Sequence, residues 1–150
     1  MWRRALPADD DAIVEMCLAL YREDPSPVPA SADKIRRTLA ALRAEPARGR
    51  AVVFDPDGQC LGYGLLISFW SNEYGGPVCM IDELCVAAPA RGRGLATVLI
   101  DELAHGSALL PNDAVALALE VTPDNRRARA LYERLGFAGR NTVFHRWIKR

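Results

Sequence analysis

Two glycines separated by one arginine lie where a strand-like run passes into a helix-like one, in the segment Arg91-Gly92-Arg93-Gly94-Leu95-Ala96. Glycine has no Cβ and accepts positive φ, so such a turn lets the backbone approach a ligand closely. The first amides of the helix have no partner within it, and the helix dipole favours an anion there. The segment therefore predicts a phosphate-binding loop in which the amides of residues 92–97 contact phosphate and Arg91 and Arg93 add positive charge.

The spacing excludes two nucleotide-binding loops. A Walker loop requires Gly-Lys-Ser/Thr, and the chain contains no Gly-Lys pair. A dinucleotide fingerprint requires glycine three residues after Gly94, where the chain has Thr97. A nucleotide-binding phosphate-loop protein is thus disfavoured.

The remaining pattern, Arg-x-x-Gly-x-Ala at 91–96, resembles the coenzyme A pyrophosphate loop of the GNAT superfamily of N-acetyltransferases. Residues 81–86 look like the strand that holds the pantetheine arm. Residues 119–125 and 130–137 look like the next strand and the helix that carry the family's Asn and Tyr. The matching segments run from about Val78 to Phe137. The resemblance implies an α/β fold with a mixed, twisted sheet and helices on both faces, and acetyl-CoA as cofactor.

The resemblance also assigns residues to the cofactor. A backbone N–H near Cys85 or Val86 would polarise the thioester carbonyl, and Tyr132 would protonate the departing thiolate; the alternative for Tyr132 is an aromatic that packs against the sheet. Asn125 would bond the pantetheine region or cap the following helix, or do both. The expected cofactor-binding residues are Leu84, Cys85, Val86, Arg91, Gly92, Arg93, Gly94, Leu95, Ala96, Thr97, Asn125 and Tyr132.

Two acidic sites compete for the role of base. Asp82 and Glu83 are adjacent on a strand, so only one can face a cleft directly; polyamine acetyltransferases carry a similar acidic pair that serves the amine. Glu120 lies twelve residues before Tyr132, a spacing similar to that in enzymes that acetylate the N-terminus of a ribosomal protein. We expect Glu120, Glu83 and Tyr132 to be catalytic and Asp82 to contact the substrate, with a water molecule able to mediate proton transfer.

A loop from Trp70 to Pro77 is rich in side chains that contact ligands, and Trp70, Glu73 and Tyr74 would suit a cationic, partly apolar amine. An aromatic cap on a hairpin is the alternative. The function expected is acetyl transfer to a primary amine by direct attack on the thioester, with a small amine as acceptor. A protein N-terminal or lysine acetyltransferase and a non-catalytic coenzyme A-binding domain stay open.

Composition places limits on partners and location. The 150 residues, half of them hydrophobic, suit one domain spanning 1–150, and zero formal net charge argues against nucleic acid or an anionic membrane as partner. No apolar leader or membrane-length segment is present. The cysteines lack the spacing of a metal site or a disulfide framework, so we expect reduced core thiols and a cytoplasmic location. His105 and His145 lack metal-ligand spacing, so we expect no metal. A homodimer stays open.

Periodicity and turn residues predict one alternating α/β unit. Strands are expected at residues 2–5, 51–54, 60–70, 78–87 and 115–121, with a final strand pair at 137–148. Helices are expected at 8–20, at 31–43 with Ser31 as N-cap, from the glycine loop to about 105, and at 125–135. The proline loop 25–29 would lie beside the substrate entrance if the resemblance holds.

Overall fold

A computed structural model describes residues 1–139 and 143–149. The chain divides into two compact units, Met1–Glu120 and Val121–Arg150. One domain over the whole chain therefore stays a prediction. Within the described residues, no helix is both long and apolar enough to span a membrane.

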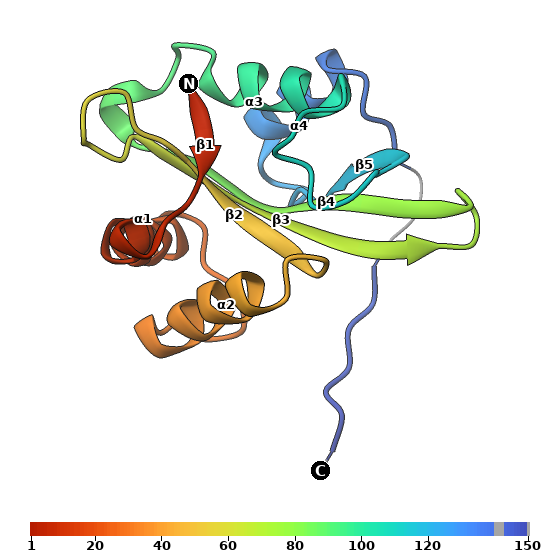
Figure 1. Cartoon of the computed structure of the whole chain (residues 1–150), viewed down its shortest axis with the longest axis horizontal. Coiled ribbons are helices and arrows are strands. Elements are labelled where there is room, and N and C mark those ends of the chain that lie inside the picture. Colours follow the sequence, from red (N-terminus) through yellow and green to blue (C-terminus); the bar gives the residue numbers. More distant parts are fainter. Residues whose placement is uncertain (140–142, 150) are drawn as a thin grey trace. The chain divides into compact units, whose positions relative to one another are not determined.

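The first unit is built on a five-stranded sheet with the order β1-β2-β3-β4-β5 (Figure 1). The strands are β1 Trp2–Arg4, β2 Gly49–Phe54, β3 Gly62–Ser71, β4 Gly76–Val86 and β5 Ala116–Leu119. Neighbouring strands are antiparallel except β4 and β5, which run parallel. The mixed sheet is confirmed, and the strands predicted at 51–54 and 60–70 form an antiparallel pair, β2 with β3, although β5 is shorter than the predicted strand at 115–121.

Two helices cover one face of this sheet and a third covers the other, as Figure 1 shows. Helix α1 spans Asp10–Glu23, α2 spans Ala32–Ala44 and α3 spans Leu95–Ala104. The core beneath α1 and α2 joins their apolar faces to the sheet, with Ile13, Leu39 and Tyr63 almost fully buried. These contacts orient α1, which carries part of the candidate site.

The helix ends follow the expected local chemistry. Ser31 caps α2 by accepting a hydrogen bond from the Lys34 amide at 3.2 Å, as predicted. Helix α1 begins after a 3₁₀ turn at Pro7–Asp9 and runs three residues past the predicted end at Leu20. It stops just before Pro25, because the residue before a proline is driven out of the helical region.

The second unit contains α4, Arg126–Arg134. The predicted strand pair at 137–148 is wrong for the residues that the structure describes there, 137–139 and 143–149, which contain no strand; residues 140–142 lie outside the described residues. Apolar residues come in pairs, 143–144 and 147–148, so the period-two alternation of a half-buried strand is missing. All four of these side chains are exposed.

Candidate active site

The turn at residues 91–94 has the geometry that the glycine spacing predicted. Gly92 and Gly94 both have φ of +77°, a left-handed conformation that favours glycine, and a Cβ on either would meet no atom within 4 Å. Gly94 is the N-cap of α3 and supplies no side chain to its amides. The first hydrogen bond of the helix runs from the Val98 amide to the Gly94 carbonyl at 3.0 Å. The amides of residues 95–97 precede this bond and have no acceptor within the helix. The turn thus leaves open space at a helix N-terminus.

Side chains from distant parts of the first unit hold this turn in place. The indole N–H of Trp2, which is 2% exposed, donates to the Leu95 carbonyl at 2.9 Å and fixes the start of α3. Arg91 donates from Nε to the Val86 carbonyl at 2.9 Å, and its Nη2 reaches both oxygens of Glu23 at 2.9 and 3.1 Å. Arg91 thus joins the turn to the end of β4 and to the last residue of α1.

Strands β4 and β5 separate beside this turn. Their pairing ends at Ile81 with Leu119, whereas β4 continues to Val86. The Ala87 amide bonds to β3 at the Leu61 carbonyl, 2.9 Å away. Because N–H groups alternate between the two edges of a strand, the Val86 N–H lies on the opposite edge, the one that β5 has left. The Val86 N–H is therefore available there to a ligand, whereas the Val86 carbonyl accepts from Arg91.

Glu83 lies on the α1 face of β4 and is held by three donors. Its Oε1 accepts from the Tyr21 hydroxyl at 2.9 Å, and its Oε2 accepts from the Tyr63 hydroxyl at 2.7 Å and from Cys17 Sγ at 3.4 Å. Burial, followed by the contact with Glu83, raises the pKa of both tyrosines, and burial raises the pKa of Cys17 to about 12. Three of roughly four lone-pair positions on this carboxylate are occupied.

Asp82 occupies a different environment. The β3–β4 register shifts between Leu65 and Leu66, which face Glu83 and Ile81, so Asp82 is the extra residue of a β-bulge. Its carboxyl group stays accessible, yet neighbouring protein removes enough water to raise its pKa, and the negative charges of Glu83 and Glu120 raise that pKa further. The structure thus brings Asp82, Glu83 and Glu120 together where β4 and β5 separate.

Neither tyrosine nor Cys17 in this network was expected from the sequence. Tyr21 follows Cys17 by one helical turn, which gives both the same face of α1. Spacing alone does not link them to Tyr63, because that contact depends on how α1 crosses the sheet. The ion pair between Arg91 and Glu23 was missed for the same reason.

The second unit carries the two other expected residues. The Asn125 side chain caps α4 by accepting from the Ala128 amide at 3.1 Å, which bears out its role as an N-cap. Burial raises the pKa of Tyr132, whose ring meets that of Phe137 edge-on at 6.0 Å. A hydroxyl in this state keeps its proton at neutral pH, as an acid must.

The aromatic hairpin is not at the same place as the acids. Strand β3 runs to Ser71 and β4 begins at Gly76, so the expected loop is a tight hairpin whose Trp70 and Tyr74 are exposed. From Gly76 to Glu83 an extended strand covers about 20 Å. A small amine at Glu83 could not also touch Trp70, Glu73 and Tyr74, so these three do not belong to a single small-molecule site with the acids. Sequence proximity to β4 was misleading, because the strand carries the acids away from its own first turn.

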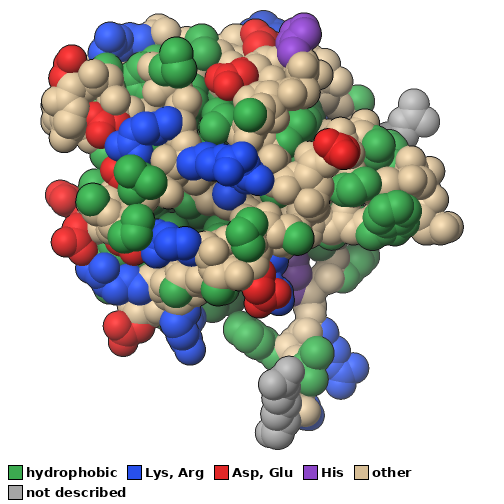
Figure 2. Space-filling model, viewed as in Figure 1, with side chains coloured by type: hydrophobic (Ala, Val, Ile, Leu, Met, Phe, Trp, Pro, Cys, Tyr) green, Lys and Arg blue, Asp and Glu red, His purple; other side chains and the backbone are tan. Residues whose placement is uncertain are grey.

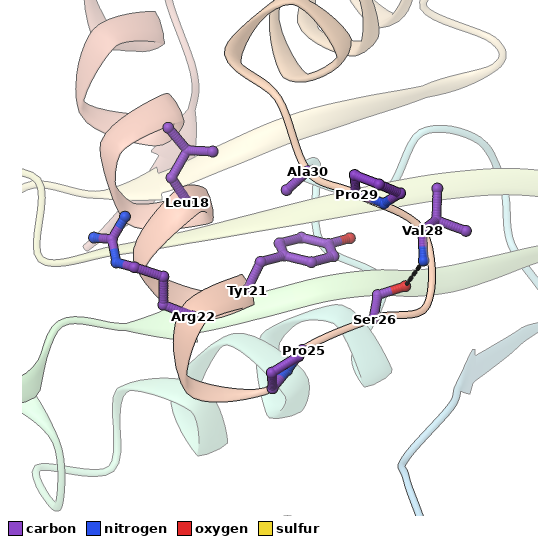
Figure 3. Close-up of a pocket in the computed structure, with 8 residues that line it drawn as sticks. All are labelled: Leu18, Tyr21, Arg22, Pro25, Ser26, Val28, Pro29 and Ala30. Carbon is purple, nitrogen blue, oxygen red and sulfur yellow. Dashed lines mark hydrogen bonds between the residues drawn. The ribbon is translucent and has the colours of Figure 1, made fainter.

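A groove of about 280 Å³ lies between α1 and the proline segment 25–30 (Figure 3). Leu18, Tyr21 and Arg22 line it from α1, and Pro25, Val28 and Pro29 line it from the segment. Tyr21 belongs both to this groove and to the hydrogen-bond network of Glu83.

The model of the acetyltransferase (GNAT) family matches residues 14–137. The chain belongs to this family. GNAT proteins use acetyl-CoA as acyl donor, and the open turn at 92–94, with uncapped helix amides behind it, fits a pyrophosphate. When bound, the cofactor would supply the activated acetyl group.

Solved structures of similar fold cover almost the whole chain. A possible acetyltransferase from Clostridium difficile 630 is 19% identical with a TM-score of 0.82, covering 100% of this chain and 97% of that one. An integron cassette protein from the mobile metagenome of Cole Harbour Salt Marsh is 26% identical with a TM-score of 0.73, covering 99% and 91%. A ribosomal-protein-alanine N-acetyltransferase from Brucella melitensis biovar Abortus 2308 is 21% identical with a TM-score of 0.74, covering 99% of both. Among curated proteins, no sequence matches the chain significantly.

Proposed function

We propose that this GNAT protein is an acetyl-CoA-dependent N-acetyltransferase that transfers the acetyl group to a small primary amine by direct attack on the thioester. The observation that carries the proposal is the parting of β4 from β5 beside the turn at 91–94. It leaves a free strand edge next to an open turn whose helix amides have no side-chain cap. A thioester could lie along this edge while its pyrophosphate rests on the amides of residues 92–97.

The roles of the chain's own groups follow from their positions. The free-edge N–H of Val86 is the donor we assign to the thioester carbonyl, where negative charge grows during attack. Leu84, Cys85 and Val86 line the edge. Arg93 adds positive charge to the loop, whereas the charge of Arg91 is paired with Glu23. We assign Tyr132 as the acid for the thiolate on the resemblance of residues 130–137 to the family's tyrosine-bearing helix, and its hydroxyl is protonated at neutral pH. Asn125, already a helix cap, would keep its amide N–H for the pantetheine region.

Proton removal from the amine is best served by Asp82 together with Glu120. Asp82 is accessible and has a raised pKa, so it is a better proton acceptor than an ordinary aspartate. Glu120 is exposed at the end of β5 and supports that raised pKa. We assign Glu83 to positioning, since three donors already hold its carboxylate.

A protein N-terminus is the second candidate acceptor. The spacing of Glu120 and Tyr132 favours it, being similar to that in enzymes that acetylate a ribosomal protein. The first unit supports the small amine instead, because the accessible acid beside the free strand edge suits a compact ligand.

The test is incubation of the purified protein with acetyl-CoA and a panel of amines, with thiol release followed over time. We expect release that depends on a small primary amine. Thiol release only with peptides that have a free N-terminus would show that the acceptor is a protein N-terminus and not a small amine. Coenzyme A binding with no amine-dependent release would indicate a non-catalytic binding domain.

A further inference from the structure

Trp2 lies at one end of a row of residues that are paired across four strands. The register joins Trp2 to Phe54, Phe54 to Gly62, and Gly62 to Val86. A Cβ on Gly62 would lie 2.9 Å from Trp2 Cη2, so the indole covers the space that this glycine leaves free. The indole therefore extends from the edge strand β1 across the sheet towards the end of β4, where the turn at 91–94 begins.

The polar end of this indole is bonded to that turn. Its N–H donates to the Leu95 carbonyl at 2.9 Å, and Trp2 is only 2% exposed. A buried indole N–H that lost this acceptor would have no water to replace it, which is costly. The bond thus fixes β1 and the start of α3 to each other, although Trp2 and Leu95 are 93 positions apart in the sequence.

We propose that Trp2 is a positioning residue for the pyrophosphate of coenzyme A. The Leu95 carbonyl and the Ala96 N–H belong to one peptide unit, which is planar and trans, so the two groups point in opposite directions. The carbonyl accepts from Trp2, and the N–H, which has no acceptor within α3, points back towards the open turn. A donor on this carbonyl therefore fixes the direction of an N–H that would meet the phosphate.

The same bond makes the Ala96 N–H a stronger donor. Hydrogen bonds at the two ends of a peptide unit polarise each other, which strengthens each by about 10–30%. Trp2 thus acts through the peptide unit between Leu95 and Ala96 and not through a contact of its own with the ligand. This inference rests on the proposed binding of coenzyme A at residues 92–97 and assigns part of that binding to the first strand of the chain.

The experiment is calorimetric titration of coenzyme A into Trp2→Phe and Phe54→Leu. Trp2→Phe keeps an aromatic ring and removes the indole N–H. Phe54→Leu is the matched control, because it loosens the contact between the two rings, whose centroids are 5.7 Å apart, and keeps the N–H. One hydrogen bond is worth a factor of about 2 to 10, so we expect coenzyme A to bind about 2- to 10-fold more weakly to Trp2→Phe and normally to Phe54→Leu.

Nuclear magnetic resonance follows the indole in the wild-type chain. The chain has three tryptophans, and Trp70 is exposed at the end of β3 that lies away from Gly62. When coenzyme A is added to protein labelled with ¹⁵N, we expect the Trp2 indole N–H resonance to shift and its exchange with water to slow. The Trp70 resonance should not change. A tryptophan that only packs in the core would show no such response.

Three results would overturn the inference: equal affinity for coenzyme A in wild type and Trp2→Phe, equal losses in Trp2→Phe and Phe54→Leu, or a Trp2 resonance that does not respond to coenzyme A. The resonance decides the matter even where Trp2→Phe does not fold. Any of these results together with acetylated amine leaves the proposed function standing. Coenzyme A binding that depends on Trp2 without any amine acetylation would instead contradict acetyl transfer and support the role of Trp2.

Discussion

Replacing Gly94 by alanine separates the phosphate-binding role of this glycine from its conformational role. Gly94 stands at the start of α3 with φ of +77°, and Gly106 stands just past its end with φ of +81°. A Cβ on either would meet no atom within 4 Å. Any other L-residue pays about 1–2 kcal/mol for a left-handed backbone, so Gly94→Ala and Gly106→Ala should lose similar stability. For a chain of this size, each kilocalorie lowers Tm by about 2–4 °C.

Only the change at Gly94 should affect coenzyme A. Helix α3 is about 15 Å long, so residue 106 is far from the turn. A methyl group at residue 94 keeps the pyrophosphate from the amides behind it, and one lost hydrogen bond to a charged group costs about 1.5–3 kcal/mol. We therefore expect coenzyme A to bind about 10- to 100-fold more weakly to Gly94→Ala by calorimetric titration, and normally to Gly106→Ala. Equal affinity in two folded variants would refute phosphate binding at this turn.

Three further predictions concern the acids and the tyrosine. Tyr132→Phe should lower kcat by about 10²- to 10⁴-fold in steady-state assays while acetyl-CoA affinity is kept, since the lost hydroxyl matters most as charge grows on sulfur; wild-type turnover would make Tyr132 a packing residue. Glu120→Gln removes a negative charge that raises the pKa of Asp82, so the acidic limb of the kcat/KM profile should move to lower pH, and Asp82→Asn should abolish that limb; an unchanged profile in both variants would contradict Asp82 as proton acceptor. Glu83→Gln weakens the acceptor of two tyrosine hydroxyls and should lower the free energy of unfolding in urea by about 1–3 kcal/mol. We expect Glu83→Gln to be less stable than Asp82→Asn, and the reverse order would argue against a positioning role for Glu83.

Local chemistry explains why much of the fold was predictable from the sequence. A helix begins after Ser31 because the Ser31 hydroxyl accepts a hydrogen bond from the Lys34 amide, and α1 ends before Pro25 because the proline ring clashes with a helical residue before it. Both helix boundaries therefore depend on near neighbours alone. The turn at Gly92 and Gly94 was predictable for the same reason. The prediction of a strand pair at 137–148 was wrong for the described residues. A strand needs a partner elsewhere in the chain, and the apolar residues of this segment lack the alternation that would specify one.

The site was only partly predictable because its geometry depends on long-range packing. The sequence pattern placed acids at 82, 83 and 120, yet it could not distinguish them. The bulge at Asp82 and the approach of α1 to the sheet separate an accessible acid from one bound by Tyr21 and Tyr63. The exposed hairpin around Trp70 has residue types that suit an amine, but it lies at the start of β4, whereas the acids lie near the end of that strand.

On the visible face of the described residues, basic and acidic side chains are interspersed (Figure 2). This agrees with zero formal net charge and gives a polyanion no uniform field on this face.

The most direct test of acetyl transfer at this site is to quantify the N-acetylated amine and the free coenzyme A thiol by mass spectrometry in the same reaction. We expect equal amounts of the two products, both dependent on the amine, both strongly reduced in Gly94→Ala and both retained in Gly106→Ala. Thiol release without acetylated amine, or equal yields from the two glycine variants, would contradict it.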